Sequence, residues 1–282
     1  MSTLREKRKK ERRALRRRKT ADWTVVLILC AIAVCCGGYL IYHHWSVKQR
    51  ELEYEKLRQE EMLSAATETV IAEPETEEST EETVIYCDPV YDFGQLHEQN
   101  EDIYAWIIVP GTQVDYPLLQ SETDNYYLDY NLDHSKGYPG CIYTNQCNRK
   151  DFSDYNTVLY GHNMKNGSMF GSIHSFEDET FFDGHPYIYV YTENERLTYE
   201  IYEAAKFTDV YIPSEYVISS KDDRDQFLAD VREKVSDNKL HVREDMEIGE
   251  EDRLITLSTC VSGERNHRYL VIGVLVETAL YR

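Results

Sequence analysis

Basic residues are scarce in most of this 282-residue chain. Residues 23–282 contain 20 Lys and Arg against 48 Asp and Glu, so this part carries a formal charge of −28. Such an excess of negative charge disfavours direct binding of nucleic acid or an anionic surface and would tolerate a basic partner. The sequence also lacks an internal repeat, and no cluster of acids stands out as a calcium site. We therefore predict neither a metal nor a cofactor.

Long apolar runs are equally rare, and only one is long enough to cross a membrane. Residues 23–42 contain no charged side chain. Twenty helical residues at about 1.5 Å each span a hydrocarbon core of roughly 30 Å. Trp23 and Trp45 suit the aromatic belts at the two membrane interfaces. Because no clear small-x-small cleavage site follows the run, an uncleaved anchor at residues 23–45 is favoured over a cleaved signal peptide.

Eleven basic residues lie within residues 1–20, directly before this run. The positive-inside rule places residues 1–22 in the cytoplasm as a basic tail and everything after the anchor outside. Nucleic-acid binding is the other reading of a basic block. Its position in front of a span is better explained by membrane topology and anionic lipid. The expected location is the cell membrane, with one pass and an extracellular domain.

Residues 46–86 are predicted to be a spacer. The first twenty are strong helix formers of mixed charge, which favours a short helix leaving the membrane. Residues 66–86 are dominated by Glu and Thr and have few apolar side chains, so they cannot bury a core and are expected to be solvated and disordered. The composition then becomes that of a globular protein, and the extracellular domain is expected to span residues 87–282.

The globular part is rich in short runs of Tyr, Val, Ile and Thr separated by turn residues. The runs predict eight strands, at residues 106–109, 114–119, 140–144, 157–161, 187–191, 197–207, 254–260 and 268–276. Their number and spacing indicate a mainly β fold, a barrel or sandwich with mostly antiparallel strands. Short helices are expected at 93–100 and 125–132. A longer helix is expected at 221–238, where Phe227, Leu228, Val231 and Val235 recur at helical spacing.

Four cysteines lie beyond the anchor: Cys87, Cys141, Cys147 and Cys260. They could form two disulfides with three possible connectivities, and Cys141 could pair with Cys147. A domain of about 190 residues can fold without bridges, so free thiols are equally compatible with the sequence. The spacing of Cys141 and Cys147, even with His134 nearby, does not match a usual zinc-ligand set.

Cys260 has the surroundings expected of a nucleophile. It ends the run 254–260, and a polar loop leads from it to Arg268 at the start of the last strand. In an antiparallel hairpin centred on Glu264, Cys260 would face Arg268 with Cβ atoms about 4.5–5.5 Å apart. The cation would favour the thiolate and could stabilise a carbonyl oxyanion. Arg265 is the alternative, and it would require a tighter hairpin.

A cysteine nucleophile also needs a base, and the chain has nine His. His162 differs from the others because it directly follows the predicted strand 157–161 and precedes a flexible polar loop. The end of a strand is a usual place to present a catalytic group. The residues alone leave open whether His162 is catalytic or a turn residue. Four other His lie in polar, loop-like sequence: His134, His174, His185 and His241.

Three segments resemble the active-site segments of sortases. They are Leu-Tyr-Gly-His-Asn-Met at 159–164, Thr-Leu-Ser-Thr-Cys at 256–260 and the strand at 268–276 that begins with Arg268. Their order and separation are also similar, as is the anchor with its spacer. Asn163, Ser258 and the helix at 221–238 resemble class B in particular. The resemblance covers roughly residues 91–282. The gap of eight residues from Cys260 to Arg268 is shorter than the gap in some class B members. Arg265 therefore remains the alternative for the cation.

The resemblance implies an eight-stranded sortase-type β-barrel with short peripheral helices and one longer helix inserted before the strand of Cys260. It also implies a cysteine transpeptidase that cleaves a C-terminal sorting signal of a secreted protein. The acyl group would pass to an amine of a peptidoglycan precursor or of a pilin subunit. Cys260 would be the nucleophile, His162 the acid and base, and Arg268 the group that binds substrate and oxyanion. The peptide groove would be lined by Ser258, Thr259, Tyr211 and Ile212.

Two other functions are compatible with the same residues. A membrane-anchored cysteine endopeptidase would use water in place of the amine. A surface binding module would use the barrel as a scaffold, with Cys260 inert or bridged. The partners expected for the transpeptidase are the secreted proteins that bear the signal, the acceptor amine and the membrane, with no nucleic acid.

Overall fold

The computed structural model describes residues 2–66, 85–234 and 240–282. The chain forms two compact units, Met1–Glu53 and Tyr54–Arg282. Most of the acidic stretch expected at 66–86 lies outside the described residues, and so does the end of the helix expected at 221–238.

Helix α1 (Ser2–Ala66) carries the one segment of the described chain that is long and apolar enough to cross a membrane. Within this segment, Trp23–Gln59, the most apolar stretch has a mean hydropathy of 2.5, and the protein buries none of it. Val25, Leu29 and Leu40, for example, are 56%, 59% and 67% exposed. A continuous apolar surface of this kind needs a covering apolar phase. A lipid bilayer would provide it, which fits the anchor expected at residues 23–45.

The last turns of α1, from Tyr54 onward, belong to the larger unit and pack against the rest of it. Tyr54 and Leu57 are only 4% and 2% exposed. The Tyr54 hydroxyl donates to the Gly140 carbonyl at 3.2 Å, and Arg58 Nε donates to the Asp115 carbonyl at 2.8 Å. Part of the stretch that composition assigned to the spacer is therefore folded onto the β domain.

Replacing Leu57 with Ala should lower the free energy of unfolding of the larger unit by about 2–3 kcal/mol, because it removes a buried side chain and leaves a cavity. Denaturant unfolding of residues 54–282 measures this change. Lys56→Ala, at an exposed position of the same turn, is the matched control and should have little effect. Equal unfolding midpoints for the two variants would contradict the packing of this helix end.

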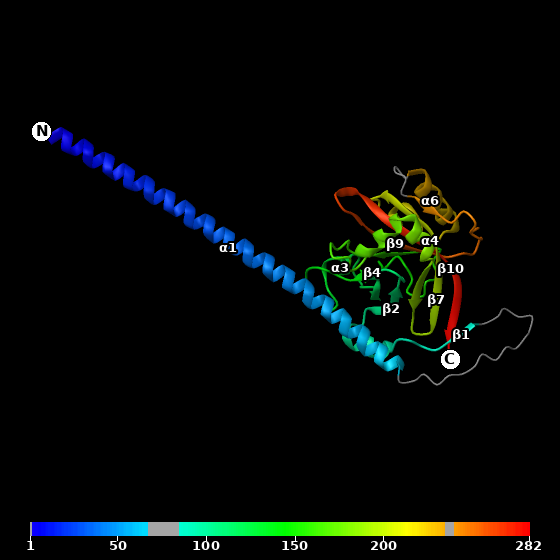
Figure 1. The fold of residues 1–282 in the computed structure, drawn as a ribbon. Coiled ribbons are helices and arrows are strands. Elements are labelled where there is room, and N and C mark those ends of the chain that lie inside the picture. Colours follow the sequence, from blue (N-terminus) through cyan, green and yellow to red (C-terminus); the bar gives the residue numbers. More distant parts are fainter. Residues whose placement is uncertain (1, 67–84, 235–239) are drawn as a thin grey trace, which may run out of the picture. The chain divides into compact units, whose positions relative to one another are not determined.

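Eight strands of the larger unit close into a barrel (Figure 1). Their order around the ring is β10-β9-β5-β4-β3-β2-β6-β7, and the pairing of β7 with β10 closes it. Six of the eight pairings are antiparallel, whereas β3–β4 and β5–β9 are parallel. The predicted mainly β barrel is therefore confirmed. The strands are β2 (Ile103–Ile108), β3 (Asp115–Leu119), β4 (Ile142–Tyr143), β5 (Asn156–Tyr160), β6 (Tyr187–Tyr191), β7 (Glu195–Thr208), β9 (Leu254–Val261) and β10 (Glu264–Tyr281).

Two short strands extend the sheet beyond the barrel. β1 (Ile85–Cys87) lies parallel to the end of β10, and β8 (His241–Val242) pairs with β7. The polar composition around His241 predicted a loop, and this prediction was wrong. A two-residue strand is too short to show an alternating pattern, so only its partner β7 determines it.

Among the helices described within residues 85–234 and 240–282, three were expected and three were not. α2 (Phe93–Gln99), α3 (Tyr126–Asp129) and α6 (Lys221–Lys234) lie within the predicted ranges. The 3₁₀ helix η1 (Gly171–Glu177) and the helices α4 (Glu179–Gly184) and α5 (Ile212–Glu215) were not predicted. His174 therefore lies on η1, not in the loop that composition predicted.

Helix α6 covers the outside of the barrel. Its Phe227 and Val231 are fully buried and share an apolar cluster with Phe207 of β7 and Leu270 of β10. A separate apolar cluster contains Tyr199 of β7, Ile255 of β9 and Val271 of β10, whose side chains lie on the opposite face of these strands. The strands that carry the site are thus packed on both faces, which gives them a rigid frame.

A carboxylate is buried beneath α6. Glu203 of β7 is 0% exposed, and its Oε2 lies 3.5 Å from Arg232 Nε of α6. Its Oε1 has no hydrogen-bond partner within the described parts of the chain. Burial raises the pKa of this carboxyl to about 7, and the partly exposed Arg232 only moderates the rise.

Replacing Glu203 with Gln should remove a pH-dependent loss of stability. The carboxyl pKa is about 7 in the folded protein against an ordinary 4.5, so the folded state holds more protons between these values. Stability falls with pH wherever the folded state binds more protons. Between these two pKa values, the unfolding free energy of the wild type should fall by up to roughly 3 kcal/mol relative to that of Glu203→Gln. At higher pH the difference between the two proteins should stay constant. Urea denaturation over a pH series measures it, and parallel curves for both proteins would contradict it.

Candidate active site

The parallel pairing of β5 with β9 sets the position of the candidate site. Tyr160, the last residue of β5, pairs with Ser258 near the end of β9. Neighbouring parallel strands end at the same edge of a sheet. His162 follows β5 directly, and Cys260 lies two residues beyond Ser258. Two residues almost a hundred positions apart in the chain therefore emerge at one rim of the barrel.

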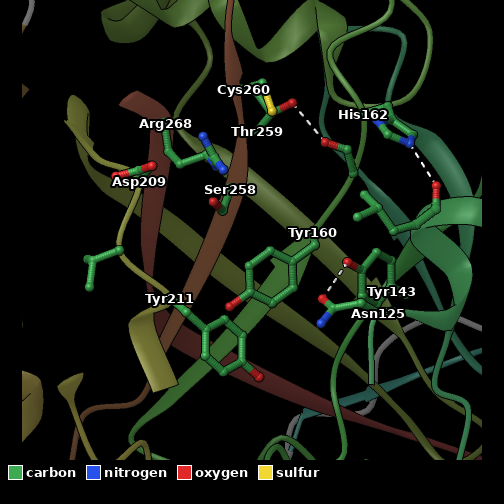
Figure 2. A pocket seen from close by; sticks show the side chains of 13 residues that line it. Asn125, Tyr143, Tyr160, His162, Asp209, Tyr211, Ser258, Thr259, Cys260 and Arg268 are labelled. Carbon is green, nitrogen blue, oxygen red and sulfur yellow. Dashed lines mark hydrogen bonds between the residues drawn. The ribbon is translucent and has the colours of Figure 1, made fainter. Parts of the chain in front are cut away.

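A cavity of about 270 Å³ opens at this rim, and His162, Cys260 and Arg268 all line it (Figure 2). Of the expected groove residues, Ser258, Thr259 and Tyr211 line it as well. The other lining residues had not been predicted and are Asn125, Leu128, Tyr143, Tyr160, Gly161, Asp209 and Val210.

Cys260 and Arg268 are direct partners in the β9–β10 pairing. The hairpin that joins them differs from the expected one, because Val261 already pairs with Glu264. In a regular ladder this tight turn would place Arg265 opposite Cys260. Residues 265–267 of β10 instead have no partners in β9, and this bulge moves the register on to Arg268. Arg265 is exposed and is absent from the cavity lining.

The bulge also provides acceptors for the cation. Arg268 Nη1 donates to the carbonyls of Arg265 and His267 at 3.3 and 3.0 Å. These bonds tie one end of the guanidinium to the bulge. The guanidinium is a lining group of the cavity and is drawn beside the strand of Ser258 in Figure 2. A permanent positive charge therefore lines the same cavity as the thiol.

The thiol of Cys260 is exposed, and none of the seven cysteines forms a disulfide. Neither disulfide considered from the sequence is formed. Cys141 is buried in the core, where Tyr54 donates a hydrogen bond to its sulfur at 3.4 Å, while Cys147 is exposed. Cys260 is therefore sterically available for reaction.

His162 is held through one ring nitrogen. Its Nε2 lies 2.7 Å from the Leu128 carbonyl oxygen, which can only accept, so Nε2 carries the proton and Nδ1 is the basic nitrogen. Tyr138 packs against the ring with centroids 4.9 Å apart. Gly140 has a positive φ of +69°, and a Cβ there would lie 2.7 Å from the Tyr127 carbonyl oxygen and 3.5 Å from His162 Cδ2. Glycine is required at this close approach.

Thr259 contacts the neighbouring strand end with its side chain. It is 2% exposed, and its hydroxyl donates to the Gly161 carbonyl at 2.7 Å. Side chains alternate along β9, so Thr259 faces away from the side of Ser258 and Cys260. Its hydroxyl therefore fixes the peptide that precedes His162.

Three tyrosines form an aromatic wall of the cavity. The Tyr160 ring lies 5.6 Å from that of Tyr143 and 6.2 Å from that of Tyr211. Asn145 donates to the Tyr211 hydroxyl at 2.8 Å, and burial raises the pKa of Tyr211 to about 12. The wall is therefore neutral at physiological pH. The abundance of Tyr at strand ends was the available sequence signal for Tyr143 and Tyr160.

Ile212 does not line the cavity. It begins α5, is 2% exposed and packs in the apolar cluster with Tyr216 and Phe227. The adjacent Tyr211 faces the cavity, whereas the turn into α5 directs Ile212 into the core. The expectation that Ile212 lines the groove is therefore corrected.

A comparison with protein families matches residues 107–276 to the sortase domain. The chain belongs to the sortase family. Members of this family are cysteine transpeptidases, and the match includes all three residues that the sequence analysis assigned to catalysis.

The relatives are class B sortases. Sortase B of Listeria monocytogenes is 34% identical over 168 residues, which are 58% of this chain and 65% of that protein. Sortase B of Staphylococcus aureus is 26% identical over 252 residues, or 88% and 93% of the two chains. The crystal structure of sortase B from Clostridium perfringens superposes with a TM-score of 0.59 and 30% identity, covering 66% of this chain and all of that one. The chain is thus a sortase B-like protein, and its match spans just under two thirds of the Listeria relative.

Replacing Thr259 with Val should lower the free energy of unfolding by about 1–3 kcal/mol, because the buried Gly161 carbonyl loses its hydroxyl donor. Thr259→Ser keeps the hydroxyl and loses only a methyl group, so it should be clearly less destabilised. Thermal and denaturant unfolding of the two variants give the comparison. A serine variant as unstable as the valine variant would show that the bond to Gly161 contributes nothing.

Proposed function

We propose that this chain is a membrane-anchored transpeptidase that cleaves a sorting signal near the C-terminus of secreted proteins. It would then join the new carboxyl end to an amine of a peptidoglycan precursor or of a pilin subunit. The observation that carries the proposal is that a free thiol, an imidazole and a guanidinium line one cavity in a member of the sortase family. Cys260, His162 and Arg268 are the groups we assign to the reaction.

The first half of the reaction forms a thioester. The Cys260 sulfur attacks the carbonyl carbon of the scissile peptide bond, and the C–N bond breaks. His162 gives the leaving amine its proton. Because Nε2 of His162 is engaged by the Leu128 carbonyl, Nδ1 is the nitrogen that we assign to proton transfer. Arg268 stabilises the negative oxygen that develops during attack.

The second half transfers the acyl group. An incoming amine attacks the thioester carbon and loses a proton to His162 Nδ1, and the Cys260 thiolate leaves. An amide bond replaces the thioester, so no oxidant, reductant or metal is needed. The neutral tyrosine wall and Ser258 would contact the extended signal peptide alongside the thiol.

The membrane topology belongs to the same proposal. Eleven basic residues before the apolar segment favour a cytoplasmic N-terminus and an extracellular barrel. The barrel would then meet secreted proteins and cell-wall precursors on the outer side of the membrane. Its negative charge does not suit nucleic acid.

The proposal is tested with the detergent-solubilised chain, a library of sorting-signal peptides and triglycine as the acceptor amine. Mass spectrometry should detect a thioester on Cys260 and a peptide ligated to triglycine, and Cys260→Ala should abolish both. Hydrolysis without ligation would indicate an endopeptidase. The absence of both cleavage and thioester would leave a binding module and end the proposal.

A matched pair of variants tests which arginine stabilises the oxyanion. Arg268→Ala should lower kcat/KM for thioester formation roughly 10²- to 10³-fold, because the oxyanion loses its charged partner. Arg265→Ala removes a neighbouring guanidinium that does not line the cavity and should leave the rate nearly unchanged. The reverse pattern would transfer the role to Arg265.

A further inference from the structure

The carbonyl of Cys260 loses its strand partner at the rim of the barrel. The last backbone bond between β5 and β9 runs from Gly161 N–H to the Ser258 carbonyl at 3.4 Å. Along a strand, every second carbonyl points to the same side, so the Cys260 carbonyl faces the edge that β5 has just left. A carbonyl in this position needs another donor.

The side chain of Asn163 takes the place of the missing strand. Its Nδ2 donates to the Cys260 carbonyl at 2.8 Å and also lies 3.2 Å from Ser262 Oγ in the β9–β10 turn. Asn163 directly follows His162. One amide group therefore links the backbone of the proposed base to the backbone of the proposed nucleophile.

His174 of η1 contacts both groups of this link. Its Nε2 lies 3.0 Å from Asn163 Nδ2 and 3.1 Å from the Cys260 carbonyl oxygen. A neutral ring with the proton on Nδ1 accepts from Asn163, whereas a doubly protonated ring donates to the carbonyl. In either state the Cys260 carbonyl keeps a side-chain donor.

Two contacts fix the His174 ring. Its Nδ1 lies 2.8 Å from Glu177 Oε1, and its face stacks on Tyr269 with centroids 4.9 Å apart and planes at 23°. Tyr269 is the neighbour of Arg268 on β10 and pairs with Thr259. The ring is therefore oriented both by η1 and by the strand that carries the cation.

We propose that Asn163, His174 and Glu177 form a carbonyl anchor, a set of positioning residues that fixes the Cys260 peptide and thereby aims the thiol at the scissile carbonyl and at His162. This inference rests on the proposed function. The sulfur is joined to the anchored peptide through only Cα and Cβ, so a rotation of the peptide moves it directly. Small errors in the placement of reacting atoms are costly in rate.

The anchor is separate from the peptide cavity. Asn163, His174 and Glu177 are all absent from its lining. Loss of the anchor should therefore affect the chemical step and leave substrate binding largely intact. A merely structural role would lower the amount of folded protein and leave kcat per folded molecule unchanged.

Asn163→Asp is the first test, because it keeps the shape of the side chain and replaces the donor with an acceptor that repels the carbonyl. In the full-length chain, kcat for thioester formation should fall roughly ten- to a hundred-fold while KM stays within about two-fold. Asn166→Asp lies in the same loop and is the matched control. The acceptor Oδ1, which receives bonds from Ser168, is kept in that variant, so its kinetics should match the wild type.

His174 is tested by loss and rescue. His174→Phe keeps a ring against Tyr269 but removes both nitrogens, and kcat should fall roughly ten-fold. His174→Gln places an amide near the position of Nε2 and should recover most of the rate. Unchanged kcat in both Asn163→Asp and His174→Phe, or losses that follow the folded fraction alone, would overturn the proposal.

A substrate-free readout separates this inference from the proposed function. The rate at which a small methanethiosulfonate labels Cys260, followed by peptide mass spectrometry, requires no sorting signal. Asn163→Asp should change this rate, and Asn166→Asp should not. If the wild type forms no thioester with any peptide, the proposed function fails while this comparison still decides the anchor. Equal labelling rates in all variants would reject the anchor.

Discussion

The antiparallel pairing of β9 with β10 is the constraint on which the candidate site depends. It places Arg268 directly across from Cys260, and it does so through a bulge of three residues after a tight turn. A regular hairpin would present Arg265 instead. The bulge also turns its own carbonyls toward the Arg268 guanidinium, so one local irregularity both selects the cation and orients it. Bulges commonly redirect side chains in this way at the rims of barrels.

The second constraint is the parallel pairing of β5 with β9. Parallel strands end together, so the chain leaves β5 into His162 at the rim where Cys260 lies. The backbone pairing of the two strands ends at that point and leaves the Cys260 carbonyl without a donor from β5. The side chains of Asn163 and His174 contact this carbonyl. These contacts and the cavity thus lie where the pairing of β5 with β9 ends.

Much of the fold was predictable because most of the barrel strands are long enough to show their pattern. All eight were located from β-branched and aromatic runs, and α6 was located from the helical spacing of Phe227 and Val231. The elements that were missed are helices of four to seven residues and strands of two or three residues. Their backbone is stabilised by neighbours such as β7 and β10, so no local pattern marks them. The burial of Leu57 likewise depends on a distant surface.

The candidate thiol, imidazole and guanidinium of the site could be predicted from the residues alone, because the segments around Cys260, His162 and Arg268 keep a recognisable order and resemble those of a known family. The sequence left Arg265 open and assigned Ile212 to the groove. Only the tertiary structure decided these points, since register depends on a bulge and the direction of a side chain depends on where a strand turns into a helix. The same holds for the contact of Asn163 with the Cys260 carbonyl, because a hydrogen bond across 97 residues leaves no trace in local sequence.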